Sequence, residues 1–155
     1  MARENMDERW GFETRAIHAG QKPDPQTGAI TVPVYQTTTY EQDEVGKDRG
    51  YEYSRTGNPT RDALEISVAA LEGAEFGRAF ASGMAAEDTI LRLLSPGDHI
   101  VMGNDAYGGT FRLISKVLTR MGVTWSAADF SKRENIENCL TDRTRVIWAE
   151  TPSNP

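Results

Sequence analysis

A dense group of residues able to bind an anion lies at positions 53–61. Tyr53, Ser54 and Arg55 are followed, after Thr56, by a Gly-Asn-Pro turn. An arginine guanidinium makes bidentate contacts to phosphate oxygens, and a tyrosine hydroxyl adds a further donor. The residues alone leave two interpretations open, a phosphate site and a surface turn with solvated arginines.

A second candidate anion site is the run Ser82-Gly83-Met84, which stands between a predicted strand and a predicted helix. Glycine lets a ligand approach the backbone closely. The first N–H groups of a helix lack partners and favour an anion. A phosphate would fit there, although the same run is also compatible with an ordinary strand-to-helix turn.

Two further segments follow predicted strands. Tyr107, among small residues at 104–110, is able to lay its ring against a flat ligand. Glu150 and Asn154 are able to bond a polar ligand edge. The structural alternatives are a loop tyrosine packed on the following helix and a proline-rich loop.

Other classes of site find no support in the sequence. His18 and His99 have no metal-ligand spacing, so we expect no metal site and interpret both as structural. The net charge of −6 argues against a nucleic-acid partner. No apolar run approaches the roughly 20 residues of a membrane helix, so we expect no membrane partner. The single cysteine, Cys139, suits a reducing cytoplasm.

The chain of 155 residues divides into two parts of different character. Residues 1–57 form a loop-rich arm, which is either disordered or lies on another surface; its Val32, Val34 and Tyr35 favour the second alternative. Residues 58–155 alternate between helices and strands. We predict helices at 58–73, 84–94, 111–121 and from Ser131, and strands at 78–81, 99–103, 123–127 and 145–149.

This alternation predicts an α/β fold with a mainly parallel sheet. In such sheets ligands bind beyond the carboxyl ends of the strands. The segments at 82–84, 104–109 and 150–155 all follow predicted strands, so each of them is a candidate place for a ligand.

Taken in order, the motifs YSR-GNPTR, SGMAA and ETPSNP resemble those of the cystathionine γ-synthase and γ-lyase family of pyridoxal-5′-phosphate (PLP) enzymes. The resemblance runs from Phe12 to Pro155. It implies an aspartate aminotransferase-like domain of fold type I, preceded by an arm that packs on a partner subunit. It also implies a homo-oligomer, at least a dimer and by resemblance a tetramer.

The resemblance assigns a role to each motif. It implies that Tyr53, Ser54 and Arg55 reach the PLP phosphate of the neighbouring subunit. The backbone of Gly83 and Met84 would hold the phosphate of the subunit's own cofactor.

Three more positions gain roles from the resemblance. Tyr107 would stack on the pyridine ring and assist proton transfer as a catalytic residue. Asn154 would lie beside the ring hydroxyl. Glu52, together with Tyr53, would contact substrate, because members that handle cystathionine carry an acidic residue there.

The chain departs from the family in length. Members are more than twice as long, and none of the lysines here stands in the family's Ser-x-Thr-Lys setting. A PLP enzyme needs such a lysine. We therefore expect the chain to be the N-terminal part of a longer polypeptide, inactive by itself.

The resemblance implies that the longer polypeptide joins an activated homoserine ester to cysteine by γ-replacement, giving cystathionine. Its substrates would be amino acids, that is, small molecules. Alternatives within the family are cystathionine γ-lysis and sulfhydrylation of O-acetylhomoserine. An alternative outside it is a non-catalytic binding or dimerisation module.

Overall fold

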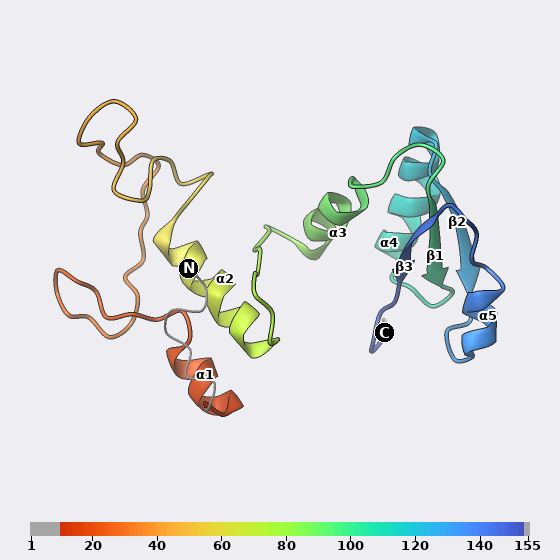
Figure 1. Cartoon of the computed structure of the whole chain (residues 1–155), viewed down its shortest axis with the longest axis horizontal. Coiled ribbons are helices and arrows are strands. Elements are labelled where there is room, and N and C mark those ends of the chain that lie inside the picture. Colours follow the sequence, from red (N-terminus) through yellow and green to blue (C-terminus); the bar gives the residue numbers. More distant parts are fainter. Residues whose placement is uncertain (1–9, 154–155) are drawn as a thin grey trace. The chain divides into compact units, whose positions relative to one another are not determined.

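A computed structural model describes residues 10–153 of the chain (Figure 1). The structure contains two compact units, one ending at Ala79 and the other starting at Phe80. The division into an arm of residues 1–57 and an α/β part from residue 58 stays a prediction.

The first unit contains two helices, α1 (Phe12–His18) and α2 (Pro59–Leu71). Helix α2 begins as predicted, because the Asn58 side chain accepts the Thr60 N–H at 2.9 Å and Pro59 occupies the first turn. Helix α1 was not predicted. It packs on α2, and just beyond it the backbone of Gly20 approaches α2 so closely that a Cβ there would meet the Ala63 carbonyl at 2.5 Å.

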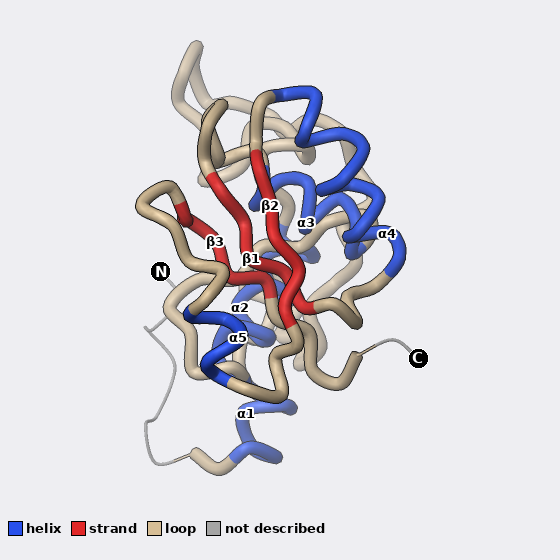
Figure 2. Tube along the Cα trace, turned by 90° about the vertical axis from the view of Figure 1, so that its right-hand side faces the viewer, coloured by secondary structure: helices blue, strands red, loops and turns tan. Residues whose placement is uncertain are grey.

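The second unit is an α/β layer whose strands are all parallel. Strand β1 lies between β2 and β3, as Figure 2 shows. The predicted α/β class with a parallel sheet is therefore confirmed. In chain order its elements are α3 (Gly83–Leu91), β1 (His99–Gly103), α4 (Gly108–Arg112), the π-helix η1 (Leu113–Val117), the 3-10 helix η2 (Leu118–Met121), β2 (Thr124–Ala128), α5 (Arg133–Glu137) and β3 (Thr144–Trp148).

The core of the second unit lies between this sheet and the helices. Every residue of β1 is buried, as expected for the central strand of a parallel sheet. The buried cluster joins strand and helix side chains: Leu91, Ile100, Met102, Ile114, Leu118 and Val123. Ile114 and Leu118 belong to the predicted apolar helix at 111–121, which changes its winding from α to π to 3-10 before Gly122 ends it at φ 84°.

Three sequence predictions of local structure are wrong. Residues 78–81 form no strand; instead the Ala79 N–H donates to Glu65 Oε1 at 2.9 Å, so a side chain replaces a strand partner. The predicted capping box at Ser131 does not form, because the short helix α5 is capped at Lys132 without a side-chain bond. Leu140, predicted to face the core, lies beyond this helix and is 45% exposed.

Candidate functional site

The loop that carries Tyr53 and Arg55 folds back on itself within the first unit. The N–H groups of Thr56 and Gly57 donate to the Tyr53 carbonyl at 2.9 and 3.0 Å. The Arg55 guanidinium carbon lies 4.9 Å from the centroid of the Tyr53 ring, a cation–π arrangement. Arg55 is exposed, so its N–H donors face solvent and are accessible to an anion.

The Ser54 hydroxyl is engaged inside the same loop. It donates to the Thr37 carbonyl and accepts from the Asn58 amide at 3.2 Å. These contacts join the loop to the preceding arm and to the cap of α2. Contact between Ser54 and PLP stays a prediction.

Arg61 braces this loop rather than facing solvent. Its Nη1 donates to the Ser54 carbonyl at 2.9 Å, and its Nη2 donates to the Arg55 carbonyl at 3.4 Å. Glu65, one turn further along α2, lies 3.7 Å from the Arg61 Nε. Sequence reasoning missed this role. The only local signal is the spacing of four residues between an arginine and a glutamate on a predicted helix.

Tyr51 also joins this loop to α2. Its hydroxyl donates to Asp62 Oδ2 at 2.9 Å, and its ring lies where a Cβ on Gly57 would approach to 3.2 Å. Burial, together with the hydrogen bond and the charge of Asp62, raises the pKa of Tyr51 to about 12. The phenol therefore stays protonated and bonded to α2 at ordinary pH.

In the second unit, the start of α3 has the features of a phosphate site. Ser82 caps the helix, its Oγ accepting the Ala85 N–H at 3.1 Å. A Cβ built on Gly83 would meet no atom within 4 Å, so the approach to the backbone is open. The N–H groups of Gly83 and Met84 open the helix, where amides have no helical acceptor and the dipole favours an anion. This donor set fits a phosphate group.

Met84 and Tyr107 converge on Gly109. A Cβ on Gly109 would collide with the Tyr107 ring and would lie 2.8 Å from Met84 Sδ. The structure thus brings together two residues predicted from separate motifs. Tyr107 is 41% exposed, so part of its ring is free to meet a flat ligand.

The Glu150 carboxylate holds the backbone at Tyr107. Its Oε2 accepts the Tyr107 N–H at 2.9 Å, while its Oε1 accepts from the Thr110 hydroxyl and the Trp148 indole, each at 3.1 Å. Burial raises the pKa of Glu150, but the three hydrogen bonds together outweigh it, so the pKa lies below its ordinary value. Glu150 was expected to bond a ligand edge, and its carboxylate instead serves these internal donors.

The candidate residues therefore fall into two groups. Glu52, Tyr53, Ser54 and Arg55 belong to the first unit, and Glu52 is exposed there. The second group is Gly83, Met84 and Tyr107. Tyr107 follows β1 and bonds Glu150, which follows the adjacent strand β3, so both lie beyond carboxyl ends of strands, where the parallel-sheet rule places a ligand site. Asn154 lies outside the described residues.

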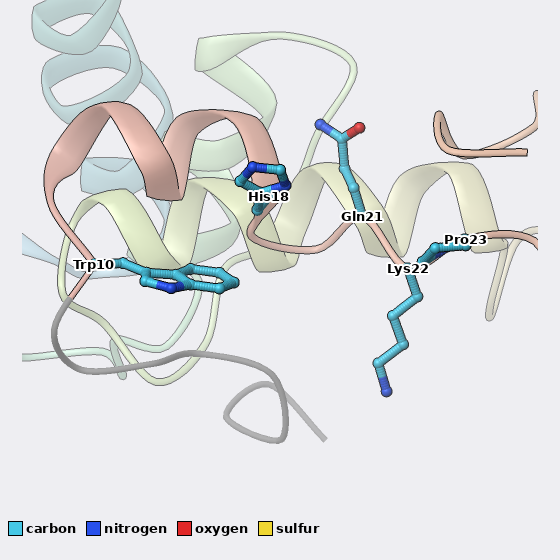
Figure 3. Close-up of a pocket in the computed structure, with 5 residues that line it drawn as sticks. All are labelled: Trp10, His18, Gln21, Lys22 and Pro23. Carbon is cyan, nitrogen blue, oxygen red and sulfur yellow. The ribbon is translucent and has the colours of Figure 1, made fainter.

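A separate open hollow of about 510 Å³ lies at α1, lined by Trp10, His18, Gln21, Lys22 and Pro23. Figure 3 shows the Trp10 indole beside the His18 ring, with Lys22 pointing away from both. None of the candidate residues lines it. Within residues 10–153, no group of three metal-ligating side chains occurs, and no helix is long and apolar enough to cross a bilayer.

Comparison with known proteins adds independent information. Residues 13–155 match the family described as "Cys/Met metabolism PLP-dependent enzyme". A cystathionine gamma-synthase from Mycobacterium bovis is 57% identical over 147 residues, covering 94% of this chain and 38% of that protein. A cystathionine beta-lyase from Coxiella burnetii is 50% identical over 152 residues, covering 97% of this chain and 39% of that protein.

Solved structures agree with these matches. The crystal structure of metB from Corynebacterium glutamicum superposes with a TM-score of 0.94 at 53% identity, covering 97% of this chain and 40% of that one. The chain thus spans about two fifths of the length of these relatives.

Proposed function

Because the chain belongs to the family of PLP-dependent enzymes of cysteine and methionine metabolism, we propose that it forms part of a cystathionine γ-synthase. Such an enzyme joins an activated homoserine ester to cysteine by γ-replacement. The observation that carries this proposal is the 57% identity to a cystathionine gamma-synthase over 94% of the chain. The geometry of the second unit supports it, because an open helix start and an accessible tyrosine ring suit a flat, phosphorylated cofactor.

The described residues supply a coherent set of contacts for PLP. The N–H groups of Gly83 and Met84 would bind its phosphate, and the Tyr107 ring would cover its pyridine face. Asn154 would lie beside the ring hydroxyl. When bound, PLP supplies an electron sink for negative charge that develops on an amino-acid carbon. Tyr107 would hold or move a proton at its phenol oxygen.

We assign Tyr53, Ser54 and Arg55 to the cofactor phosphate of a neighbouring subunit, which makes a dimer the smallest active unit and a tetramer the expected assembly. Exposed apolar residues in the first unit support a surface covered by another chain. Ile30 is 74% exposed, and on α2 Leu64 is 55% exposed. A reducing cytoplasm would suit an enzyme of this kind with Cys139 as its one cysteine.

Glu52 is our candidate for a substrate contact, together with Tyr53. Its backbone is fixed because its carbonyl accepts the Tyr40 N–H at 3.1 Å, while its side chain is exposed. A carboxylate held at this place is able to pair with the ammonium group of an amino-acid substrate.

We further propose that the 155 residues do not turn over substrate by themselves. None of their lysines, Lys22, Lys47, Lys116 and Lys132, stands in the Ser-x-Thr-Lys setting of the family. The comparison to make is between this segment and the full-length protein, each supplied with PLP. Turnover by the segment alone would refute this part of the proposal.

A β-lyase is the competing function, favoured by the 50% identity to a cystathionine beta-lyase. A product assay on the full-length protein separates the two. The assay offers cysteine, sulfide and cystathionine as competing substrates, together with a homoserine ester. We expect cystathionine to form from cysteine and the ester. The absence of cystathionine with every homoserine ester, together with cleavage of added cystathionine, would replace the synthase by a lyase.

A further inference from the structure

We propose that Glu150 is a positioning residue that sets the Tyr107 ring for the cofactor by holding the Tyr107 backbone amide. The inference rests on the proposed PLP function. It concerns a side chain that does not itself need to touch cofactor or substrate. Its basis is the network around the Glu150 carboxylate in the second unit.

The Tyr107 backbone is fixed on both sides of its Cα. Tyr107 is the cap residue of α4, and its carbonyl accepts the Phe111 N–H at 3.0 Å. Its own N–H precedes the helix and has no helical acceptor. Glu150 Oε2 supplies that acceptor at 2.9 Å from a position 43 residues further along the chain. These two backbone bonds fix the direction of the Tyr107 Cα–Cβ bond, and Gly109 leaves room for the ring beside it.

The carboxylate is itself oriented by two donors. The Thr110 hydroxyl and the Trp148 indole N–H each lie 3.1 Å from Glu150 Oε1. Thr110 is fully buried, and its single hydroxyl proton is shared between Glu150 and Glu87 Oε2, which lies 2.7 Å away on α3. The network therefore joins α3, the helix whose start is proposed for the phosphate, to the tyrosine proposed for the ring.

Only a side chain whose two terminal atoms both accept hydrogen bonds satisfies this arrangement. The Tyr107 N–H and the Trp148 indole N–H can only donate, and they reach different oxygens of the same side chain. A glutamine at 150 has the same shape but replaces one oxygen with an NH₂ group, which opposes one of these donors. Glu150→Gln is therefore the informative substitution.

The first experiment uses the cofactor-free, full-length protein and measures hydrogen exchange at the Tyr107 amide. We expect Glu150→Gln to speed this exchange about tenfold, because the neutral amide either turns its NH₂ group toward the Tyr107 N–H or accepts from it in a weaker, uncharged hydrogen bond. The matched control is Glu134→Gln, an exposed glutamate on α5. Unchanged exchange at Tyr107 would show that Glu150 does not hold the Tyr107 amide and would overturn the proposal, whatever the protein binds.

The second experiment measures PLP affinity and the visible circular dichroism of the bound cofactor. We expect Glu150→Gln to weaken PLP binding about tenfold and to reduce the dichroism per bound PLP. Thr110→Val should act in the same direction, and Thr110→Ser should restore the wild-type signal. A loss of melting temperature with affinity and dichroism intact would make Glu150 merely structural and overturn the proposal.

A double variant tests whether Glu150 acts through the ring. In a Tyr107→Ala background, Glu150→Gln should weaken PLP binding no further, because no ring remains to be positioned. Additive losses would overturn the route through Tyr107. If the wild-type protein bound no PLP while the exchange result held, the proposed function would fail, but the contact by which Glu150 holds the Tyr107 amide would stand.

Discussion

At the scale of single residues, Gly109 decides where two side chains of the candidate site lie. Gly109→Ala would place a methyl group against the Tyr107 ring and 2.8 Å from Met84 Sδ. Overpacking of this kind typically costs about 1–3 kcal/mol. We expect PLP affinity, measured by titrating the apoprotein, to fall at least about tenfold as the ring is displaced.

Gly11→Ala is the matched control for this change. Gly11 is exposed, has an ordinary extended backbone at φ −67°, and a Cβ there would approach the Glu13 carboxylate only to 3.6 Å. Equal PLP affinities for the wild type and Gly109→Ala would show that the ring position does not matter for the cofactor.

The residue scale also shows what the sequence could and could not predict. Gly83 and Tyr107 were predicted because Gly83 opens a helix and Tyr107 follows strand β1, and both positions have a local physical meaning. The role of Glu150 was missed because its bond to the Tyr107 N–H spans 43 positions and leaves no local pattern. The role of Arg61 was missed because its bonds to the Ser54 and Arg55 carbonyls depend on how the loop folds back.

At the scale of elements, His99, the first residue of β1, joins the three strands at the end of the sheet opposite the candidate site. Its ring nitrogens bond Thr144 Oγ1 on β3 at 2.9 Å and Ser126 Oγ on β2 at 3.1 Å. His99→Leu leaves both hydroxyls without this partner. We expect the free energy of unfolding to fall by about 1–3 kcal/mol in urea denaturation.

The same substitution should leave PLP affinity unchanged. Strand β1 runs from His99 to Gly103, so roughly 13 Å of extended chain separates its two ends. His18→Leu, at the exposed histidine of α1, is the matched control and should barely change stability. If His99→Leu lowered PLP affinity as well as stability, the two ends of the strands would be energetically coupled.

Elements were predictable where sequence pattern and burial agree. Strand β1 lies at 99–103 as predicted, because its apolar run is buried on both faces. The strand predicted at 78–81 failed because apolar residues alone do not provide a neighbouring strand. Helix α1 was missed because its cap, Gly11, makes no side-chain bond and none of its residues is buried. Local sequence signals predict an element poorly where its formation depends on packing against distant parts of the chain.

At the scale of the whole molecule, the proposed assembly makes one subunit depend on another. Tyr53 and Arg55 lie in the first unit, and we assign them to the cofactor of a neighbouring subunit. Arg55→Ala should therefore damage the partner's site, while loss of the cofactor-binding lysine in the full-length protein should damage a subunit's own site. Mixing the two inactive variants should restore activity in some mixed dimers.

The yield of this rescue follows from counting sites. In a mixed dimer, one site receives both defects and the other receives neither, so about half of the wild-type activity per mixed dimer is the upper limit. Product formation after co-refolding measures it, with each variant refolded alone as the control. Activity no greater than in these controls, with mixed dimers present, would mean that Arg55 serves the site of its own chain, and the exposed apolar residues of the first unit would then need a different explanation.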